Sequence, residues 1–143
     1  MESIYAKKTL NDYEIGQFAL FTKTISASDV MLFAGISGDL DPLYLNREFG
    51  ESTVYGSQLA HPMLVASMIG GAVFRLLKPD FYPVSRSFEV VKPFPVGETV
   101  TTRAVITEKD EEHHQIKLLL EAYNSAGELV VKGTSTEQME IRK

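Results

Sequence analysis

The stretch from His61 to Leu77 constrains the fold of this chain more than any other part of the sequence. Its longest run without a charge extends from Pro62 to Phe74. Proline suits the first helical position, so the pattern predicts a helix that begins at Pro62. The run is shorter than the about 20 residues that a membrane span needs, so we expect no membrane association. The helix is apolar on nearly all sides, and we therefore expect other parts of the chain to enclose it.

The rest of the chain has the pattern of one short helix and several strands. Ser26 or Ser28 can cap a helix that ends near Gly35 to Gly38, and the polar segment from Asn46 to Gln58 is expected to be a loop with room for one helical turn. Short turns join the later runs, which favours an antiparallel meander. The runs that are rich in β-branched and aromatic residues are Gln17 to Ser26, Val84 to Val91, Thr99 to Thr107, Gln115 to Tyr123 and Glu128 to Gln138.

These elements predict an α+β fold in which a curved antiparallel sheet wraps around one long central helix. Gly70 and Gly71 lower the helix propensity of that helix, and we expect another backbone, such as a strand, to approach closely there. A single sheet leaves its edge strands unpaired, so we expect a homodimer that forms through an edge strand.

Length and composition exclude several classes of protein. The chain has 143 residues, which is the size of one domain, so we expect residues 1–143 to form a single domain. A formal net charge of −5 argues against nucleic-acid binding. The chain has no cysteine, which excludes disulfides, thiolate metal sites and a cysteine nucleophile. The polar N-terminus lacks an apolar signal segment, so we expect a cytoplasmic protein, and no motif calls for a cofactor.

Four residues in the part of the chain before the central helix are candidates for chemistry. Asp39 and Asp41 flank a loop that Pro42 fixes, and such carboxylates either act as general acid or base or cap the turn. His61 either caps the helix or titrates near neutral pH. Tyr44 either donates a hydrogen bond or packs in a wall.

The other histidines carry less information. His113 and His114 lie in a charged turn from Glu108 to His114, and we expect a solvated hairpin there rather than a metal site. The sequence has no Gly-x-Ser-x-Gly nucleophile motif and no glycine-rich phosphate loop.

Three blocks of the sequence, in this order, resemble the MaoC-like hydratases, which are also called (R)-specific enoyl-CoA hydratases. The blocks are Phe33 to Leu43, Leu59 to Ser67 and Phe88 to Val100. The resemblance implies the hot-dog fold and the addition of water to trans-2-enoyl thioesters, carried by coenzyme A or acyl carrier protein. The product it implies is an (R)-3-hydroxyacyl thioester.

The resemblance also implies site residues, and this chain departs from the family at several of them. In the family an aspartate and a histidine activate water, and a glycine N–H polarises the thioester carbonyl. Asp39 matches the aspartate, Tyr44 stands in place of the histidine, and Asp41 stands in place of an asparagine. His61 matches the residue that precedes the helix, and Pro62 replaces the glycine.

These departures change the available chemistry. A tyrosine with a pKa of about 10 is a poor base at neutral pH. Proline has no backbone N–H, and the loss of one oxyanion donor costs about 10²–10³ in turnover. The first hypothesis is a hydro-lyase that uses Asp39 with help from Tyr44, Asp41 or His61. The second is a non-catalytic acyl-thioester-binding or partner subunit, and the third is a thioesterase.

The thioester itself requires a cleft and local positive charge. The apolar lining beside the central helix is expected to include Pro62, Met63, Ser67 and Met68. The candidate cations for coenzyme A, chosen by their position in the sequence, are Arg75, Lys78, Arg86 and Lys92.

Overall fold

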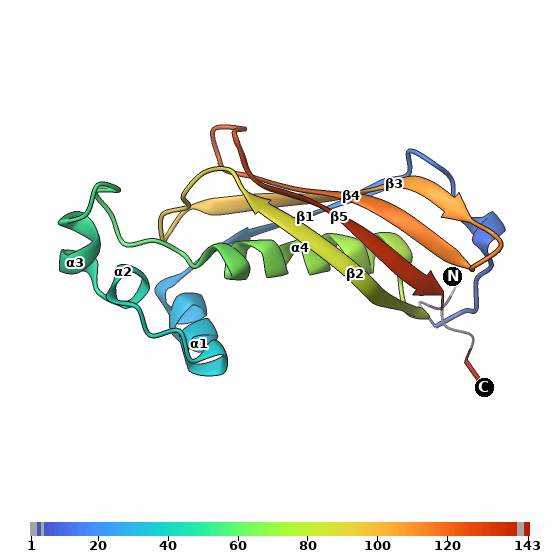
Figure 1. Ribbon diagram of the computed structural model, residues 1–143, viewed down its shortest axis with the longest axis horizontal. Helices are drawn as coiled ribbons and strands as arrows, with labels where there is room; N and C mark the ends of the chain where they lie inside the picture. Colours follow the sequence, from blue (N-terminus) through green and yellow to red (C-terminus); the bar gives the residue numbers. More distant parts are fainter. Residues whose placement is uncertain (1–2, 4, 140–141) are drawn as a thin grey trace.

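The structure is a computed structural model, and it describes residues 3, 5–139 and 142–143. An antiparallel sheet of five strands forms one layer, and helix α4 (Pro62–Leu77) lies along one face of it (Figure 1). The strands are β1 (Phe18–Thr24), β2 (Phe81–Val90), β3 (Thr99–Asp110), β4 (Gln115–Tyr123) and β5 (Leu129–Met139). A 3₁₀ turn (Leu10–Asp12) precedes the sheet, and the short helices are α1 (Ala27–Ser37), α2 (Pro42–Leu45) and α3 (Arg47–Glu51).

The order of the strands in the sheet is β1-β3-β4-β5-β2, with every neighbouring pair antiparallel. β3, β4 and β5 form the predicted meander, but β2 pairs with β5, so the prediction that β2 and β3 are neighbours is wrong. The connection from β2 to β3 contains two prolines and passes along the chain that precedes α4. Ala60 N–H donates to the carbonyl of Phe94 (2.8 Å), and Val96 N–H donates to that of Gln58 (3.0 Å).

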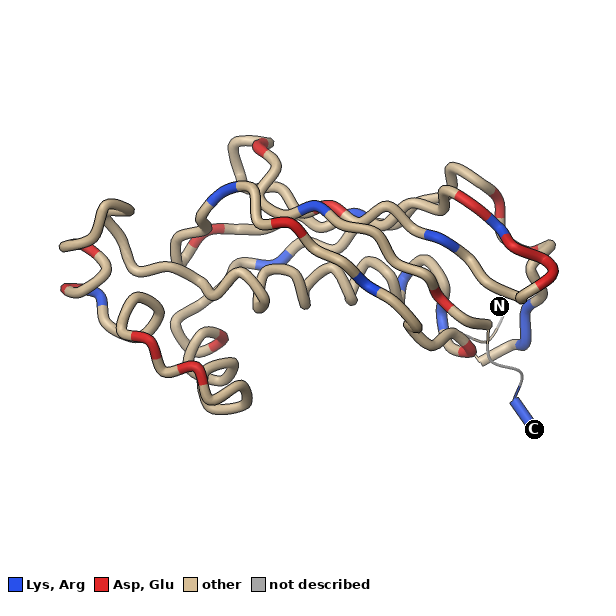
Figure 2. The backbone as a smooth tube through the Cα atoms, viewed as in Figure 1, with Lys and Arg blue, Asp and Glu red and all other residues tan. Residues whose placement is uncertain are grey.

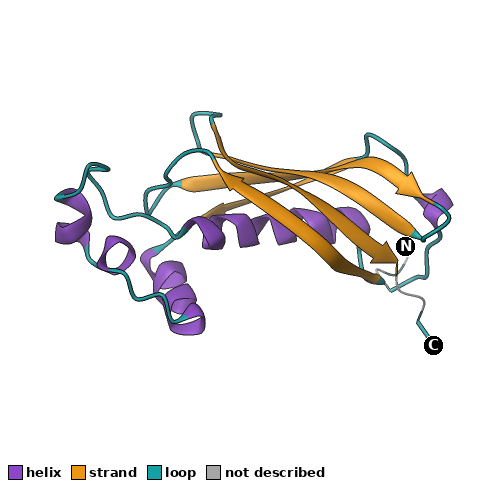
Figure 3. Ribbon diagram, in the orientation of Figure 1, coloured by secondary structure: helices purple, strands orange, loops and turns teal. Residues whose placement is uncertain are grey.

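Helix α4 buries one face against the sheet and exposes another. Met63 and Phe74 are 47% and 53% exposed, and Ser67 between them is exposed too. Their spacing places them on one side of the helix. The expectation that the chain encloses this helix on nearly all sides is wrong for that side, because one sheet covers one face only (Figure 3). The residues that α4 buries are Leu64, Val65, Ala66, Ile69, Ala72, Val73, Leu76 and Leu77.

The two glycines of α4 have different surroundings. A Cβ atom at Gly71 would lie 2.7 Å from Cδ1 of Phe21, a side chain of β1, whereas one at Gly70 would meet nothing within 4 Å. The expectation that another backbone approaches both glycines is therefore wrong. An aromatic side chain from the sheet takes the space at Gly71, and Gly70 lies next to open space.

The segment from α1 to α3 extends beyond the end of the sheet at which α4 begins (Figure 1). Ser26 caps α1 through a hydrogen bond from Asp29 N–H (3.2 Å), and Gly38 ends the helix in the left-handed region at φ 76°. The segment expected to be a loop with one helical turn contains the five-residue α3, which Asn46 caps by accepting from Phe49 N–H (2.9 Å). Arg47 is the one basic residue in this acidic part of the chain (Figure 2).

Within the described residues, no helix is long and apolar enough to cross a membrane.

Candidate active site

Asp39 and His61 are 22 residues apart in the sequence and meet in the structure. Asp39 lies in the loop between α1 and α2, and His61 is the residue that caps the N-terminus of α4. Nε2 of His61 lies 2.8 Å from Oδ2 of Asp39. The carboxylate side chain is 44% exposed and the imidazole 17%, so the pair has one face open to solvent.

The second hydrogen bond of His61 fixes its tautomer. Met63 N–H donates to Nδ1 of His61 at 3.0 Å, and a backbone N–H is always a donor. Nδ1 is therefore unprotonated, and the ring proton of the neutral imidazole is on Nε2, from which it is donated to Asp39. His61 thus acts as a helix cap and as a donor to the carboxylate at the same time.

Two aromatic rings hold the imidazole of His61 in place. The ring of Tyr44 lies 4.7 Å from it between centroids, at an interplanar angle of 44°. The ring of Phe33 lies 5.1 Å from it, at 47°. Because these contacts restrict the imidazole, the direction of the bond from His61 to Asp39 is set by packing as well as by the helix cap.

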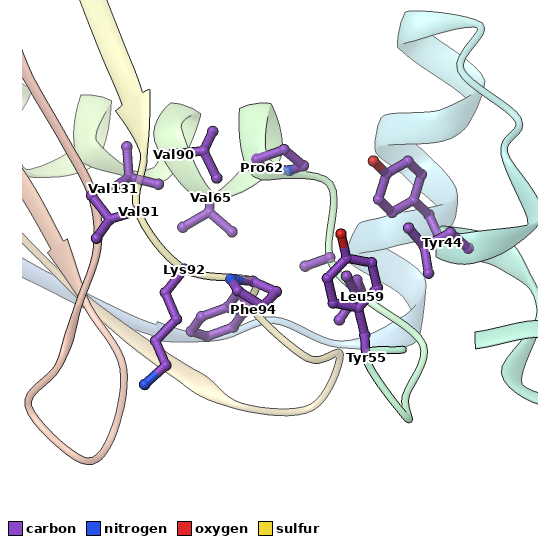
Figure 4. A pocket seen from close by; sticks show the side chains of 13 residues that line it. Tyr44, Tyr55, Leu59, Pro62, Val65, Val90, Val91, Lys92, Phe94 and Val131 are labelled. Carbon is purple, nitrogen blue, oxygen red and sulfur yellow. The ribbon is translucent and has the colours of Figure 1, made fainter. Parts of the chain in front are cut away.

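A cavity of about 280 Å³ lies at the start of α4 (Figure 4). Tyr44 and Pro62 line it, whereas His61 and Asp39 do not; the cavity meets the pair through Tyr44, whose ring packs on His61, and through Pro62, the residue after His61. Its other walls are mostly apolar and come from the start of α4, from the connection that follows β2, and from β5. The remaining lining residues are Leu43, Tyr55, Leu59, Ala60, Val65, Val90, Val91, Lys92, Pro93, Phe94 and Val131.

The hydroxyl of Tyr44 is free to bind a ligand. It has no hydrogen-bond partner among the described residues, and in Figure 4 it points toward Pro62 across the cavity. Burial, followed by the charges of Asp39 and Asp41 and by the neighbouring Tyr55, raises the pKa of Tyr44 above its ordinary value of 10.0. The hydroxyl is therefore protonated at neutral pH and can donate a hydrogen bond.

Asp41 was expected either to act as an acid or base or to cap the turn, and in the structure it caps the turn. Its Oδ1 accepts from Leu43 N–H at 2.9 Å, which caps the start of α2. Its own backbone N–H donates to Oδ1 of Asp39 at 3.3 Å. Asp41 therefore shapes the loop around Asp39, and its carboxylate points toward the backbone of α2.

Of the four residues expected to bind substrate, Pro62 lines the cavity. Met63, Ser67 and Met68 do not line it. The hydroxyl of Ser67 donates to the carbonyl of Leu64 at 2.6 Å, within the same helix. These residues were expected to line a cleft beside the central helix, but the helix turns them away from this cavity.

The first turn of α4 offers no free backbone N–H to a ligand. Pro62 has none, and Met63 N–H is bound to the His61 side chain. The next two N–H groups, those of Leu64 and Val65, donate to the carbonyl of His61 at 2.9 and 3.2 Å. A ligand carbonyl at the helix start must therefore find its donor elsewhere.

Of the four candidate cations, only Lys92 lies at the cavity beside Tyr44. Nη1 of Arg75 donates to the carbonyl of Leu20 (3.0 Å), and Nη2 of Arg86 binds the buried carboxylate of Glu137 (2.7 Å). Lys78 and Arg86 border a separate cavity of about 190 Å³ at the far end of α4. Lys92 lines the cavity beside Tyr44, where it forms an ion pair with Glu128.

Several residues of the site were missed by sequence reasoning. Phe33, which packs on His61, lies in α1 and had no signal beyond its place in an apolar helix. Val90 ends β2, Val91 follows it, and Val131 lies in β5. These residues come together because β2 pairs with β5, and that strand order was not predicted. An apolar residue in a strand shows that it faces an interior, but it does not show which cavity it lines.

The histidines of the β3–β4 turn lie apart from this site. Nδ1 of His113 is 2.8 Å from Oδ2 of Asp110, and the carboxylate is held by hydrogen bonds within the turn. These bonds to His113 lower the pKa of Asp110. In the described residues, no group of three or more His, Asp or Glu side chains is placed to hold a metal ion.

The geometry therefore defines an α+β protein with an Asp–His pair and an apolar cavity at the start of its central helix. The chain matches the family model of the MaoC like domain over residues 12–127. An (R)-specific enoyl-CoA hydratase of Rhodospirillum rubrum is 33% identical over 132 residues, which are 92% of this chain and 91% of that protein. The chain belongs to the MaoC-like family.

Solved structures agree with this assignment. The R-hydratase PhaJ1 from Pseudomonas aeruginosa superposes with a TM-score of 0.87 at 25% identity, covering 94% of this chain and 86% of that one. The (R)-hydratase of Aeromonas caviae superposes with a TM-score of 0.86 at 28% identity, covering 89% and 97%. The predicted hot-dog fold is thereby confirmed.

Proposed function

We propose that this protein is a lyase that adds water to trans-2-enoyl-CoA thioesters, or removes it from (R)-3-hydroxyacyl thioesters, in fatty-acid-type metabolism. The observation that carries the proposal is the bond from His61 to Asp39 beside an apolar cavity. The relatives named as (R)-specific enoyl-CoA hydratases, at 33% and 30% identity, support the same reaction.

Asp39 is the group that we assign as the base. His61 cannot take a proton at Nδ1 without breaking its bond to Met63 N–H, and its Nε2 already carries a proton. Each carboxylate oxygen of Asp39 accepts one hydrogen bond, from Asp41 N–H or from His61, and keeps a lone pair that can take a proton. His61 is therefore a positioning residue, because its Nε2–H orients the carboxylate.

The reaction follows from this assignment. Asp39 takes one proton from a water molecule as the water oxygen forms a bond to C3 of the enoyl chain. The electron pair of the C2–C3 double bond moves toward the thioester carbonyl and gives an enolate. C2 then takes the proton back from Asp39, so one water molecule has been added across the double bond. Dehydration is the same sequence in reverse.

We assign the cavity to the acyl chain of the substrate. Its valine, leucine and phenylalanine walls suit an apolar chain, and burial of each CH₂ group contributes about 0.8 kcal/mol. Lys92 lies in its lining and is the candidate cation whose position suits the anionic carrier. The thioester of coenzyme A or of acyl carrier protein is thus the ligand class that we propose for this cavity.

We also propose that the protein is a homodimer, and that residues 1–143 act as one domain in each copy. The exposed side of α4 carries Met63 and Phe74, and the adjacent edge strand β2 exposes Tyr82, Val84 and Val90 by 61%, 53% and 53%. A second copy of this chain would cover both surfaces if the two β2 edges met, since identical edges can pair about a two-fold axis.

An activity assay tests the proposed function. Purified protein is mixed with trans-2-enoyl-CoA thioesters of increasing chain length, and the loss of the conjugated thioester absorbance is followed. We expect turnover, with a 3-hydroxyacyl-CoA product of R configuration. A folded protein that binds these thioesters but hydrates none of them would instead support the binding-subunit alternative and overturn the proposal.

A further inference from the structure

The hydration of an enoyl thioester places negative charge on the carbonyl oxygen, and a donor must stabilise it there. In this chain the start of α4 cannot supply that donor. Pro62 has no N–H, and the backbone N–H groups of Met63, Leu64 and Val65 all have partners within the helix start. The donor must therefore be a side chain that lines the cavity and lies close to Asp39.

We propose that the hydroxyl of Tyr44 is the catalytic donor that binds the thioester carbonyl and stabilises the enolate. This inference rests on the proposed function. Tyr44 lines the cavity opposite Pro62, and its ring packs on His61, which in turn binds Asp39 (Figure 4). One side chain thus links the cavity to the Asp–His pair and has an unused O–H.

The packing of Tyr44 determines where its hydroxyl can act. A carbonyl oxygen bound by this hydroxyl has C3 of the same chain two bonds beyond the carbonyl carbon. C3 can then lie at the end of the cavity where Tyr44 contacts His61, which binds Asp39. The acyl chain continues into the apolar part, along Val65, Val91 and Val131.

The other polar groups in the cavity lining suit this role less well. Tyr55 is 51% exposed, and no ring contact fixes it to His61. The ammonium group of Lys92 is engaged by Glu128. The amide nitrogen of Gln58, which lies next to this region, already donates to the backbone carbonyl of Tyr44 at 2.6 Å.

The two departures of this chain from the family pattern, at positions 44 and 62, then compensate for each other. A tyrosine at position 44 supplies an O–H donor, and a proline at position 62 supplies none, and both residues face the same cavity. The pKa of Tyr44 is raised, which keeps the proton on the hydroxyl. The proton stays on Tyr44 throughout: the hydroxyl donates a hydrogen bond to the enolate oxygen, while Asp39 carries the transferred proton.

A cycle of variants at the two positions tests the inference. Tyr44→Phe keeps the ring that packs on His61 and removes the donor, so we expect kcat to fall by about 10²–10³-fold with KM nearly unchanged. Pro62→Ala or Pro62→Gly restores a backbone N–H at the cavity. We expect the double variants to have a kcat about tenfold or more above that of Tyr44→Phe alone. In the wild-type background, we expect the same Pro62 substitutions to change kcat little.

The cycle has distinct outcomes. Tyr5→Phe, which removes a hydroxyl from a tyrosine that is 66% exposed and lies outside both the cavity and the proposed dimer contact, is the matched control and is expected to leave kcat unchanged. If Tyr44→Phe retains wild-type kcat, or if Tyr55→Phe causes the loss in its place, the inference is overturned. A fall in kcat that neither Pro62 variant reverses overturns it as well, because the role of Tyr44 would then be one that a carbonyl donor cannot replace.

A spectroscopic measurement separates this inference from the proposed function. Bound butyryl-CoA, which has no double bond to hydrate, is labelled at its carbonyl carbon, and the infrared band of that carbonyl is recorded. We expect the band of the wild-type complex to lie at lower wavenumber than that of the Tyr44→Phe complex. Equal bands would overturn the inference, even if the wild-type protein hydrates enoyl thioesters. If the protein hydrates no enoyl thioester but the two carbonyl bands still differ, the proposed function is overturned, while the hydrogen bond from Tyr44 to the thioester carbonyl stands.

Discussion

At the scale of single residues, His61 has two tasks that compete for one ring. Its Nδ1 caps α4 and its Nε2 orients Asp39, so both bonds exist only while the imidazole is neutral and protonated on Nε2. A residue that acted as the base would have to give up one of these bonds in every cycle. This is the reason for assigning the base to Asp39 and the positioning role to His61.

Two substitutions of His61 separate these tasks. Asparagine is a good helix cap but is too short to reach Asp39, so we expect His61→Asn to keep most of the unfolding free energy and to lose turnover. His61→Ala removes both bonds, so it should lose turnover and also about 1 kcal/mol of stability. Thermal unfolding and kcat, measured on both variants, check this. Wild-type turnover in His61→Asn would show that the bond to Asp39 is dispensable.

The family resemblance placed Asp39, Asp41, Tyr44 and His61 in one predicted site, whereas composition and spacing alone gave them as separate candidates. The Asp-x-Asp-Pro loop and the His-Pro start of the helix drew attention to Asp39, Asp41 and His61, because charged groups beside an apolar helix are unusual. The contact of Asp39 with His61 was not predictable, since it depends on how the loop after α1 returns to α4. Neither was the tautomer of His61, which a single backbone N–H determines.

At the scale of elements, α4 is a helix with two different apolar faces. One face packs on the sheet, and Phe21 from β1 approaches it so closely at Gly71 that a Cβ there would lie 2.7 Å from the ring. The other face, with Met63 and Phe74, is exposed in this chain. The sheet therefore accounts for only one of the two apolar faces of α4, and the proposed homodimer would account for the other.

We expect Gly71→Ala to destabilise the fold. The added methyl group must displace the Phe21 ring, and such overpacking costs about 1–3 kcal/mol. Gly35→Ala in α1 is the matched control, because nothing lies within 4 Å of its Cβ position and alanine favours a helix. Urea unfolding of both variants measures the difference. A Gly71→Ala variant as stable as Gly35→Ala would mean that Phe21 moves aside without cost.

The elements themselves were largely predictable, and their arrangement was less so. Runs with strand composition correspond to β1, β3, β4 and β5, and the proline start and apolar run correspond to α4. The position of β2 was wrong because short connections normally join neighbours, whereas this one contains Pro93 and Pro95 and follows the chain before α4. Pairing of β2 with β5 is a long-range choice that no local pattern encodes.

At the scale of the whole molecule, some of the exposed apolar side chains lie on two neighbouring elements of the chain. The outer side of α4 and the edge strand β2 are adjacent in sequence, and both carry large apolar side chains. The segment from α1 to α3 extends from the body of the protein and bears the loop with Asp39 (Figure 1). A dimer would bury apolar surface that folding of one chain does not.

Light scattering after size exclusion tests the homodimer. We expect the mass of two chains, and we expect Phe74→Asp to yield one chain, because a charge would be buried at the centre of the contact. Val54→Asp is the control, since Val54 is 96% exposed in the loop after α3 and lies outside the proposed contact. A wild-type monomer, or a Phe74→Asp variant that stays dimeric, would contradict this arrangement.

The central claim is that Asp39 performs hydratase chemistry although Tyr44 and Pro62 stand where the family has a histidine and a glycine. The most direct measurement is the rate of hydration of a short trans-2-enoyl-CoA by wild type, by Asp39→Asn, and by Asp110→Asn as the control in the other Asp–His pair. The account predicts that Asp39→Asn loses about 10²–10⁴-fold in kcat while Asp110→Asn matches wild type. Equal turnover by wild type and Asp39→Asn would contradict it.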